Sequence, residues 1–208
     1  MSSDRARPII FSSSSVEAIL DGRKKQTRRI CRPQPLYDDG LWHVFYPWGE
    51  GGHGIYESET ELRAEYDRLT LWHCPYGHPG ARLWVRETWA PHHDGIAYRA
   101  SHCVSGAFRW RSPIHMPRAA SRIVLEVKAV RVERLQEITE ADAKAEGAPS
   151  FFERFPSIGR DQRLTTGELA SDKPHRASFA VGWDELNAAR APWVDDPFVW
   201  VVSFERSS

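Results

Sequence analysis

The pattern of apolar and polar residues predicts a strand and a helix near the start of the chain. Residues 8–11 (Pro-Ile-Ile-Phe) form a short apolar run that is typical of a strand. Ser14 followed by Glu17 is a capping-box pattern, so a short helix is expected over residues 16–20. Gly22 ends that helix, because glycine adopts the left-handed conformation at little cost. The segment that follows therefore begins where a helix ends and a strand is about to start.

Two later segments alternate like half-buried strands. In residues 82–89, Leu83 is expected on the face opposite Trp84. Residues 121–135 alternate in the same way, but the parity of the apolar positions changes near Ala129. Such a change predicts a β-bulge or a sharp bend, which is common in small closed barrels.

The second half of the chain predicts two helices and a final strand. Residues 139–147 begin with a capping threonine, end with glycine and contain strong helix formers. Phe179, Trp183 and Leu186 have the spacing of an amphipathic helix. Residues 198–204 are almost all apolar, which favours a buried strand.

Between these elements lie two loop-rich stretches, which we interpret as insertions. The first, about 33–80, is rich in Pro and Gly and contains one charged helix or hairpin within residues 57–71. The second, about 148–177, is expected to be a mobile loop. A brief strand is expected at residues 95–99. The sum is an α+β fold in one domain over residues 8–206: a small mixed β-barrel with two or three flanking helices.

Composition narrows the class of protein. The chain has 208 residues and zero formal net charge, and 41% of its residues are hydrophobic, which suffices for a core. No stretch approaches the roughly 18–20 apolar residues of a membrane span, and the N-terminus has no apolar signal region. The three cysteines are odd in number and widely spaced, which argues against a disulfide framework. We therefore expect a cytoplasmic protein that does not contact membranes, of undetermined oligomeric state.

Candidate zinc ligands lie close together in the sequence at His73, Cys74 and His78, with Cys31 and Cys103 at a distance. A structural zinc site normally takes four well-spaced ligands, and the chain has no Cys-x-x-Cys. The sequence therefore predicts neither a metal nor another cofactor.

One segment concentrates positive charge. Six basic residues occur within ten positions: Arg23, Lys24, Lys25, Arg28, Arg29 and Arg32. In a neutral protein such a cluster creates a local field that attracts anions, phosphate above all. The alternative is an ordinary solvated surface loop, as most charge runs are.

Several motifs together resemble a known family. In order along the chain they read Gly-Arg-Lys-x-Gln-Thr-Arg-Arg, Cys-Pro-Tyr-Gly-x-Pro-Gly, Leu-Trp-Val-Arg-Glu-Thr-Trp, Ser-Pro-Ile-His-Met-Pro and Val-Trp-Val-Val-Ser-Phe. This combination resembles ASCH-domain proteins, in particular the longer type of bacteria and their phages or prophages. The resemblance implies a PUA-like β-barrel, related to modules that bind RNA and modified bases.

The resemblance also implies a site. The family motif Gly-x-Lys-x-x-Thr-x-Arg lines a cleft beside the barrel and corresponds here to Gly22, Lys24, Thr27 and Arg29. Small bacterial relatives are amidohydrolases acting on acetylcytidine with a Lys, a Thr and a Glu, which implies Lys24, Thr27 and Glu146. Other relatives have been described as ribonucleases. This chain is longer than the minimal hydrolases and carries Lys25 where relatives often have Thr, so the activity does not transfer automatically.

The chemistry of these residues leaves two interpretations open. In amide hydrolysis, Thr27 would be the nucleophile or position a water, and Lys24 would act as base if burial or cationic neighbours lowered its pKa. Pairing with Glu146 would instead hold Lys24 charged, as an electrostatic stabiliser. In the simpler interpretation, Lys24, Arg28 and Arg29 contact phosphates and Thr27 donates a hydrogen bond.

A second group of candidates lies in the strand-like segment 82–89 and beyond. Trp84 can stack on a base, Arg86 can reach phosphate, and Glu87 can accept from a cytosine amino group. His115, in a basic loop, can transfer protons near neutral pH. The structural alternatives are a packed tryptophan, a surface Arg–Glu pair and a histidine bonded to the backbone.

The preferred hypothesis is a domain that binds RNA, another single-stranded nucleic acid or a modified nucleoside through a basic cleft. Its expected ligand contacts are Gly22, Arg23, Lys25, Arg28, Arg29, Trp84, Arg86, Glu87 and His115, around Lys24, Thr27 and Glu146. The alternative is a hydrolase of an acylated nucleoside or a ribonuclease, so enzyme activity is left open. A third possibility is an accessory protein that works through protein contacts.

Overall fold

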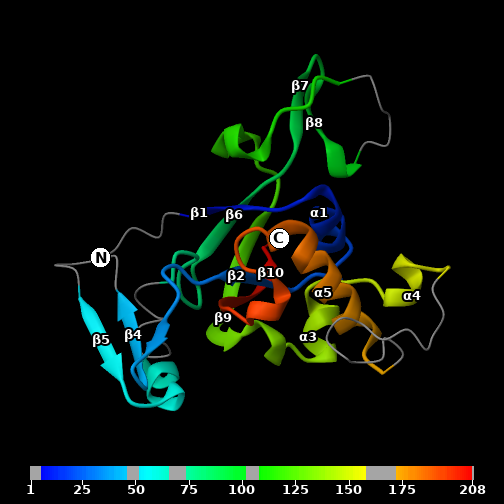
Figure 1. Ribbon diagram of the computed structural model, residues 1–208. Coiled ribbons are helices and arrows are strands. Elements are labelled where there is room, and N and C mark those ends of the chain that lie inside the picture. The colour runs from blue at the N-terminus through cyan, green and yellow to red at the C-terminus, as the bar shows by residue number, and fades with distance from the viewer. Residues whose placement is uncertain (1–5, 46–51, 66–73, 102–107, 158–171, 208) are drawn as a thin grey trace.

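A five-stranded sheet forms the centre of the fold in the computed structural model, which describes residues 6–45, 52–65, 74–101, 108–157 and 172–207. Its order is β1-β6-β9-β10-β2, where β1 runs parallel to β6 and the other neighbours are antiparallel (Figure 1). The strands are β1 (Arg7–Ile10), β6 (Arg82–Arg86), β9 (Val124–Arg134), β10 (Phe198–Arg206) and β2 (Gln26–Ile30). The α+β class is thus confirmed. Among the described strands, however, no pairing between β1 and β2 closes the sheet into a barrel.

Each face of the sheet carries its own core. On one face, Leu83 and Val85 pack with Leu125 and other residues, as the alternation in residues 82–89 predicts. On the other face, helices α3 (Glu140–Ala145) and α5 (Pro174–Asn187) cover Val199 and neighbouring apolar side chains. Strand β10 is buried on both sides, with its even-numbered residues in the first core and Val199 and Val201 in the second. Burial on two faces explains why this strand is almost continuously apolar.

The change of parity in the long strand is a β-bulge. Val127 pairs with Phe204 and Ala129 pairs with Ser203, so Lys128 is the extra residue. The bulge turns Val132 toward the interior after a run in which odd-numbered residues face it. The prediction of a bulge near Ala129 is therefore confirmed.

The described helices include α1 (Ser13–Leu20), α3 (Glu140–Ala145), α4 (Phe151–Arg154) and α5 (Pro174–Asn187). Helix α1 starts earlier than expected: its N-cap is Ser12, whose hydroxyl accepts from the Ser15 amide at 3.3 Å, and not Ser14. The expected loop at 148–177 also needs correction, because it contains α4 and the first turn of α5. Leu186 lies on α5 but is 73% exposed, so the apolar face of this helix is narrower than its spacing suggests.

The first insertion contains a small sheet that the sequence pattern did not predict. It is formed by β3 (Leu36–Asp38), β4 (Leu41–Phe45) and β5 (His53–Tyr56), all antiparallel. A helix follows at residues 59–65. This group lies at the lower left of Figure 1, away from α5.

A second hairpin, β7 (Trp89–His92) with β8 (Gly95–Tyr98), stands at the top of Figure 1. Strand β8 matches the brief strand expected at 95–99. Short 3-10 turns complete this region: η1 (Arg99–Ser101), η2 (Pro113–His115) and η3 (Arg118–Ala120). None of the helices in the described part of the chain has the length and apolarity that a membrane span requires.

Candidate functional site

A cleft of about 950 Å³ lies where the two edge strands of the main sheet approach each other. Its lining comes from the end of β1, the start of α1, strand β2, the turn after α3 and one side of α5. Arg29 of β2 spans the opening: its guanidinium donates to the Ile10 carbonyl of β1 at 2.6 Å and lies over the Phe11 ring at 5.1 Å. We call the space with this lining the cleft. It lies in the gap that the sheet leaves between β1 and β2.

Lys24 and Glu146 form a buried ion pair inside the cleft. The Lys24 ammonium donates to Glu146 Oε2 at 2.8 Å and to the Glu146 carbonyl at 2.7 Å. Both side chains are almost inaccessible, with 6% and 5% of their surface exposed. The two residues are 122 positions apart in sequence. The convergence expected from the resemblance is thus present in space.

Local backbone structure holds this pair in place. Gly22, at φ +74°, turns the chain after α1, and the Lys24 amide then donates to the Ala18 carbonyl at 2.8 Å. Glu146 is the C-cap of α3 and pairs with Lys24 in a single β-bridge. Gly147, at φ +77°, follows directly, and a Cβ there would come within 3.0 Å of the Lys24 Cβ. The positive φ and this crowding together favour glycine at position 147.

Burial sets the protonation behaviour of Lys24. Removal from water lowers the pKa of its ammonium below the usual 10.5, and the charges of Arg29 and Arg28 lower it further. The Glu146 carboxylate acts in the opposite direction without cancelling the lowering. Lys24 therefore releases its proton more readily than a surface lysine does.

Thr27 and Arg28 lie next to each other on β2 and differ in their bonding. Both are buried, and both line the cleft. Within the described residues, the Thr27 hydroxyl has no side-chain hydrogen bond. Arg28 instead donates to Glu146 Oε1 at 3.3 Å and to Glu133 Oε2 at 2.8 Å. Thr27 therefore keeps a hydroxyl that can bond a ligand, whereas much of Arg28 is already engaged.

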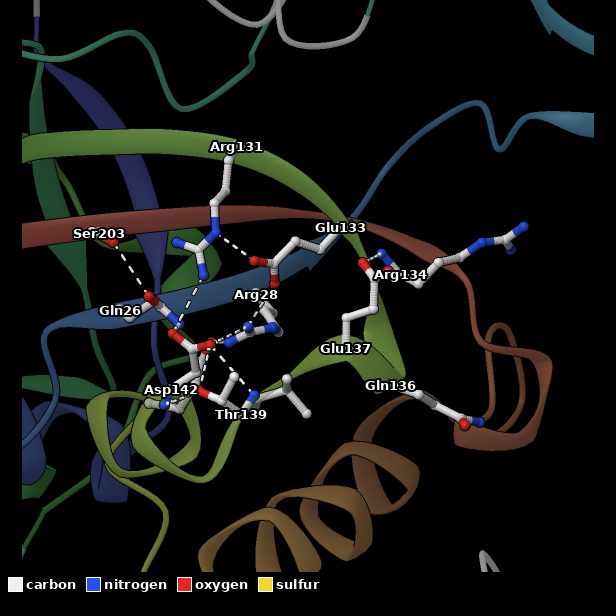
Figure 2. Close-up of polar contacts among 12 residues, drawn as sticks. Gln26, Arg28, Arg131, Glu133, Arg134, Gln136, Glu137, Thr139, Asp142 and Ser203 are labelled. Atoms are coloured by element: carbon white, nitrogen blue, oxygen red, sulfur yellow. Dashed lines mark hydrogen bonds and ion pairs between the residues drawn. The ribbon is translucent and has the colours of Figure 1, made fainter. Parts of the chain in front are cut away.

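A polar network behind the cleft fixes α3 against the sheet (Figure 2). Asp142 Oδ1 accepts from Gln26 at 3.2 Å and from Arg131 at 3.3 Å, and Asp142 Oδ2 lies 3.5 Å from Arg28. The same carboxylate caps α3 through Thr139. Burial alone would raise the pKa of Asp142, but the bonds from Thr139 and Gln26 and the Arg28 charge lower it. This network positions the turn that carries Glu146.

The cleft carries a clear excess of positive charge. Six basic and two acidic residues line it: Lys24, Arg28, Arg29, Arg32, Arg154 and Arg190 against Glu146 and Glu185. Arg154 is paired with Glu185, but Arg32 and Arg190 have no ion-pair partner among the described residues. These two exposed cations are free to meet an anionic ligand.

The expected ligand contacts within the basic segment separate into two groups. Lys24, Thr27, Arg28 and Arg29 line the cleft. Arg23 points away and pairs with Asp21 at 2.9 Å, and Lys25 is exposed outside the lining. Gly22 shapes the turn without lining the cleft. The residues of the basic segment that line the cleft are thus Lys24 and members of β2, whereas Gly22, Arg23 and Lys25 belong to the turn before that strand.

The second group of candidates lies outside the cleft, contrary to the expectation of one shared site. Glu87 is 1% exposed and accepts from Arg122 at two distances of 2.9 Å, so its carboxylate is occupied. Arg86 donates to the carbonyls of Ile114 and Met116 and lies over Trp84.

His115 is exposed on η2, and Trp84 is 9% exposed, beside Arg86. None of the four candidates Trp84, Arg86, Glu87 and His115 lines the cleft.

Several lining residues were not predicted from the sequence. Ser178 lines the cleft with its hydroxyl buried and without a hydrogen-bond partner in the described part of the chain. Arg154 and Ser178 lie in or beside the stretch expected to be a loop, where no pattern marked them. The run of serines at 12–15 carries only a helix-start signal, although three of them line the cleft. Arg190 follows α5 in an unpatterned segment.

Metal ligands do not gather in the cleft. Among the described residues, one group has suitable geometry, the exposed His92, His93 and Asp94 at the β7–β8 turn. Cys31 and Cys74 are both buried, and burial raises the pKa of the Cys74 thiol to about 11. His73 and Cys103, which belonged to the zinc pattern considered above, lie outside the described residues.

Comparison of the chain with protein-family models, with curated proteins and with solved structures found no match.

Proposed function

We propose that the cleft binds one nucleotide of RNA or of another single-stranded nucleic acid, or a modified nucleoside. The observation that carries the proposal is the meeting of Lys24, Thr27 and Glu146 in one basic cleft. A volume of about 950 Å³ lies in the range of small-molecule sites, roughly 300–1,000 Å³. RNA as the ligand and a cytoplasmic location are parts of this proposal.

The edge of β2 offers further groups for recognition. The Lys25 carbonyl accepts from the Phe204 amide at 2.8 Å, and the Cys31 amide donates to the Phe198 carbonyl at 3.0 Å. Bonds to a neighbouring strand alternate along an antiparallel pair, so the amides of Arg28 and Ile30 point away from β10, toward the cleft. Backbone groups of this kind can pair with the edge of a base, while Arg32 and Arg190 meet phosphate.

The fold part of the proposal is a PUA-like domain of the ASCH type. The approach of β1 and β2, spanned by Arg29, supports an opened version of such a barrel. Of the motif residues, Lys24, Thr27 and Arg29 line this opening, and Gly22 makes the turn that precedes them.

A titration with cytidine, its monophosphate and acetylcytidine tests binding, because Trp183 and Trp200 line the cleft and report on it by fluorescence. Arg32→Gln is expected to weaken binding of the monophosphate about tenfold, which corresponds to one charge-assisted hydrogen bond of about 1.4 kcal/mol. Arg23→Gln is the matched control, since Arg23 is exposed in the same segment but does not line the cleft. Equal effects of the two substitutions, or no binding of any of the three ligands, would refute the proposal.

A second candidate function is hydrolysis of an acylated nucleoside, favoured by one specific observation. The free Thr27 hydroxyl shares the cleft with a lysine whose pKa is lowered by burial. Thr27 Oγ would attack the acyl carbon and pass its proton to neutral Lys24, which would return it to the amino nitrogen of the nucleoside as the carbon–nitrogen bond breaks. A water that gives its proton to Lys24 would then hydrolyse the acyl-threonine and release the acid, and the Thr27 oxygen would recover that proton. Activity would then rise with pH up to a value below 10.5, where Lys24 loses its proton.

Chromatography of acetylcytidine incubated with the protein decides between the two functions. Turnover that is lost in Thr27→Val and in Lys24→Met supports hydrolysis. Binding without turnover leaves the nucleotide site and removes the hydrolase. Turnover that survives both substitutions removes Thr27 and Lys24 from the chemistry.

A further inference from the structure

The described residues 86–101 and 108–122, here called the arm, differ in charge from the remaining chain. The arm contains the β7–β8 hairpin and the turns η1, η2 and η3, and it stands at the top of Figure 1. Six of the 28 basic residues but only two of the 28 acidic residues fall within it. The arm therefore carries a formal charge of +4 and the remaining chain −4. Such an asymmetry in a neutral protein indicates an anionic partner.

The two acidic residues of the arm do little to offset its arginines. Glu87 is buried and already pairs with Arg122 through both carboxylate oxygens. Asp94 lies 2.9 Å from the His93 ring. Four exposed arginines remain without an ion-pair partner among the described residues: Arg99, Arg109, Arg111 and Arg118. Against these four cations the arm exposes one carboxylate, that of Asp94, so its accessible charge is predominantly positive.

Aromatic rings lie among these arginines. Arg111 lies over Trp89 at 5.2 Å, and Arg99 lies over Trp110 at 5.8 Å. Trp110 is partly exposed, and its ring centre is 5.0 Å from that of Phe108. Exposed cations beside accessible aromatic rings suit a single strand, because its bases are free to stack while the cations meet phosphate.

The arm begins at the edge of the cleft. Arg86, its first residue, pairs with Ile10, and the Phe11 amide donates to the Arg86 carbonyl at 3.1 Å. Ile10 and Phe11 both line the cleft, yet no residue of the arm does. A strand lying along the arm would therefore reach the cleft without sharing its residues.

We propose that the arm is a second nucleic-acid surface, which binds a single-stranded segment through its free arginines and the Trp110 ring. This surface extends the function proposed for the cleft but depends on different residues. The shared chemistry is the phosphate backbone with unstacked bases, so RNA and DNA single strands are both tested.

Fluorescence anisotropy with labelled 20-nucleotide single strands of RNA and DNA, and with the matching duplexes, tests the arm. The variant Arg109→Glu/Arg118→Glu is compared with Lys144→Glu/Arg206→Glu, which changes the net charge equally at exposed positions outside the arm and the cleft. The arm variant is expected to lose roughly 10- to 100-fold in single-strand affinity, and its slope against log salt to fall by about 1.4, as two lost phosphate contacts require. The control is expected to stay within about threefold of the unsubstituted protein.

Trp110→Leu separates stacking from charge. It is expected to weaken single-strand binding roughly 5- to 100-fold without changing the salt slope. Equal affinities of the two charge variants would overturn the proposal. So would duplexes or poly-glutamate that bind as tightly as the single strands.

Titration of the arm variant with cytidine monophosphate keeps the two proposals apart. Unchanged binding is expected, because the arm does not line the cleft. If the monophosphate fails to bind even the unsubstituted protein while the arm effect is present, the cleft proposal fails and the arm stands. If the monophosphate binds and the arm variant keeps its single-strand affinity, the arm proposal fails and the cleft proposal stands.

Discussion

Glu146→Gln is expected to destabilise the folded protein by about 3–5 kcal/mol, the usual cost of breaking a buried ion pair on one side. Glu146 contacts the Lys24 ammonium at 2.8 Å and the Arg28 guanidinium at 3.3 Å, and its side chain is 5% exposed. Arg28 keeps Glu133 and Asp142 as partners. Lys24 would keep only neutral acceptors at residue 146, the backbone carbonyl and the glutamine oxygen, so most of the cost falls on a buried ammonium without a counter-charge.

Urea unfolding followed by tryptophan fluorescence measures this loss. With a slope of about 2 kcal/mol per molar urea, the midpoint should fall by roughly 1.5–2.5 M. The loss should shrink as the pH rises. Without Glu146 the folded pKa of Lys24 falls further below its unfolded value near 10.5, so deprotonation at high pH relieves the folded state more than the unfolded one.

Two comparisons complete this test. Lys24→Met/Glu146→Leu should recover most of the stability, because apolar residues of similar size replace a buried pair at little cost. Arg23→Met removes one member of a pair whose side chains are more than half exposed, and it should cost less than about 1 kcal/mol. If Glu146→Gln also cost less than about 1 kcal/mol, or if its cost did not depend on pH, the account of a desolvated ion pair would be refuted.

Two further predictions follow from the turns and the thiols. Gly147→Ala should cost about 2–3 kcal/mol in urea unfolding and Gly22→Ala only about 1, because both have positive φ but only Gly147 is crowded; equal costs would contradict the crowding. In a Cys103→Ser background, Cys31 and Cys74 should react with a thiol reagent at pH 8 only as the protein unfolds, since burial raises the pKa of both; rapid labelling of the native protein would contradict their burial.

Several local elements were predictable from the sequence because each follows a short-range rule, but the bounds of β2, whose residues show no apolar alternation, were not. The capping threonine and terminal glycine gave α3, and the parity change gave the bulge at Lys128. The order of the strands in the sheet was harder to predict, because the alternation within a strand does not show which strands lie beside it. The three-stranded sheet of the first insertion escaped because its strands are short and flanked by Gly and Pro.

Part of the candidate site was likewise predictable and part was not. The meeting of Lys24, Thr27 and Glu146 was implied by the family resemblance and not by the residues themselves. Glu87 shows where residue chemistry alone fails: a carboxylate beside tryptophans suggested a base contact, but Arg122, 35 positions away, occupies it. Such a partner is visible only once the strands are paired.

The position of β10 in the sheet has a consequence for synthesis of the protein. This strand separates β9 from β2, and Ser203 contacts Gln26 across 177 positions. While the ribosome is still making the chain, β2 must therefore wait, without a neighbour, until residues near 200 emerge. Between the synthesis of β2 and that of β10, a cationic strand is exposed to chaperones and to cellular polyanions. The cleft is therefore one of the last features of the molecule to form.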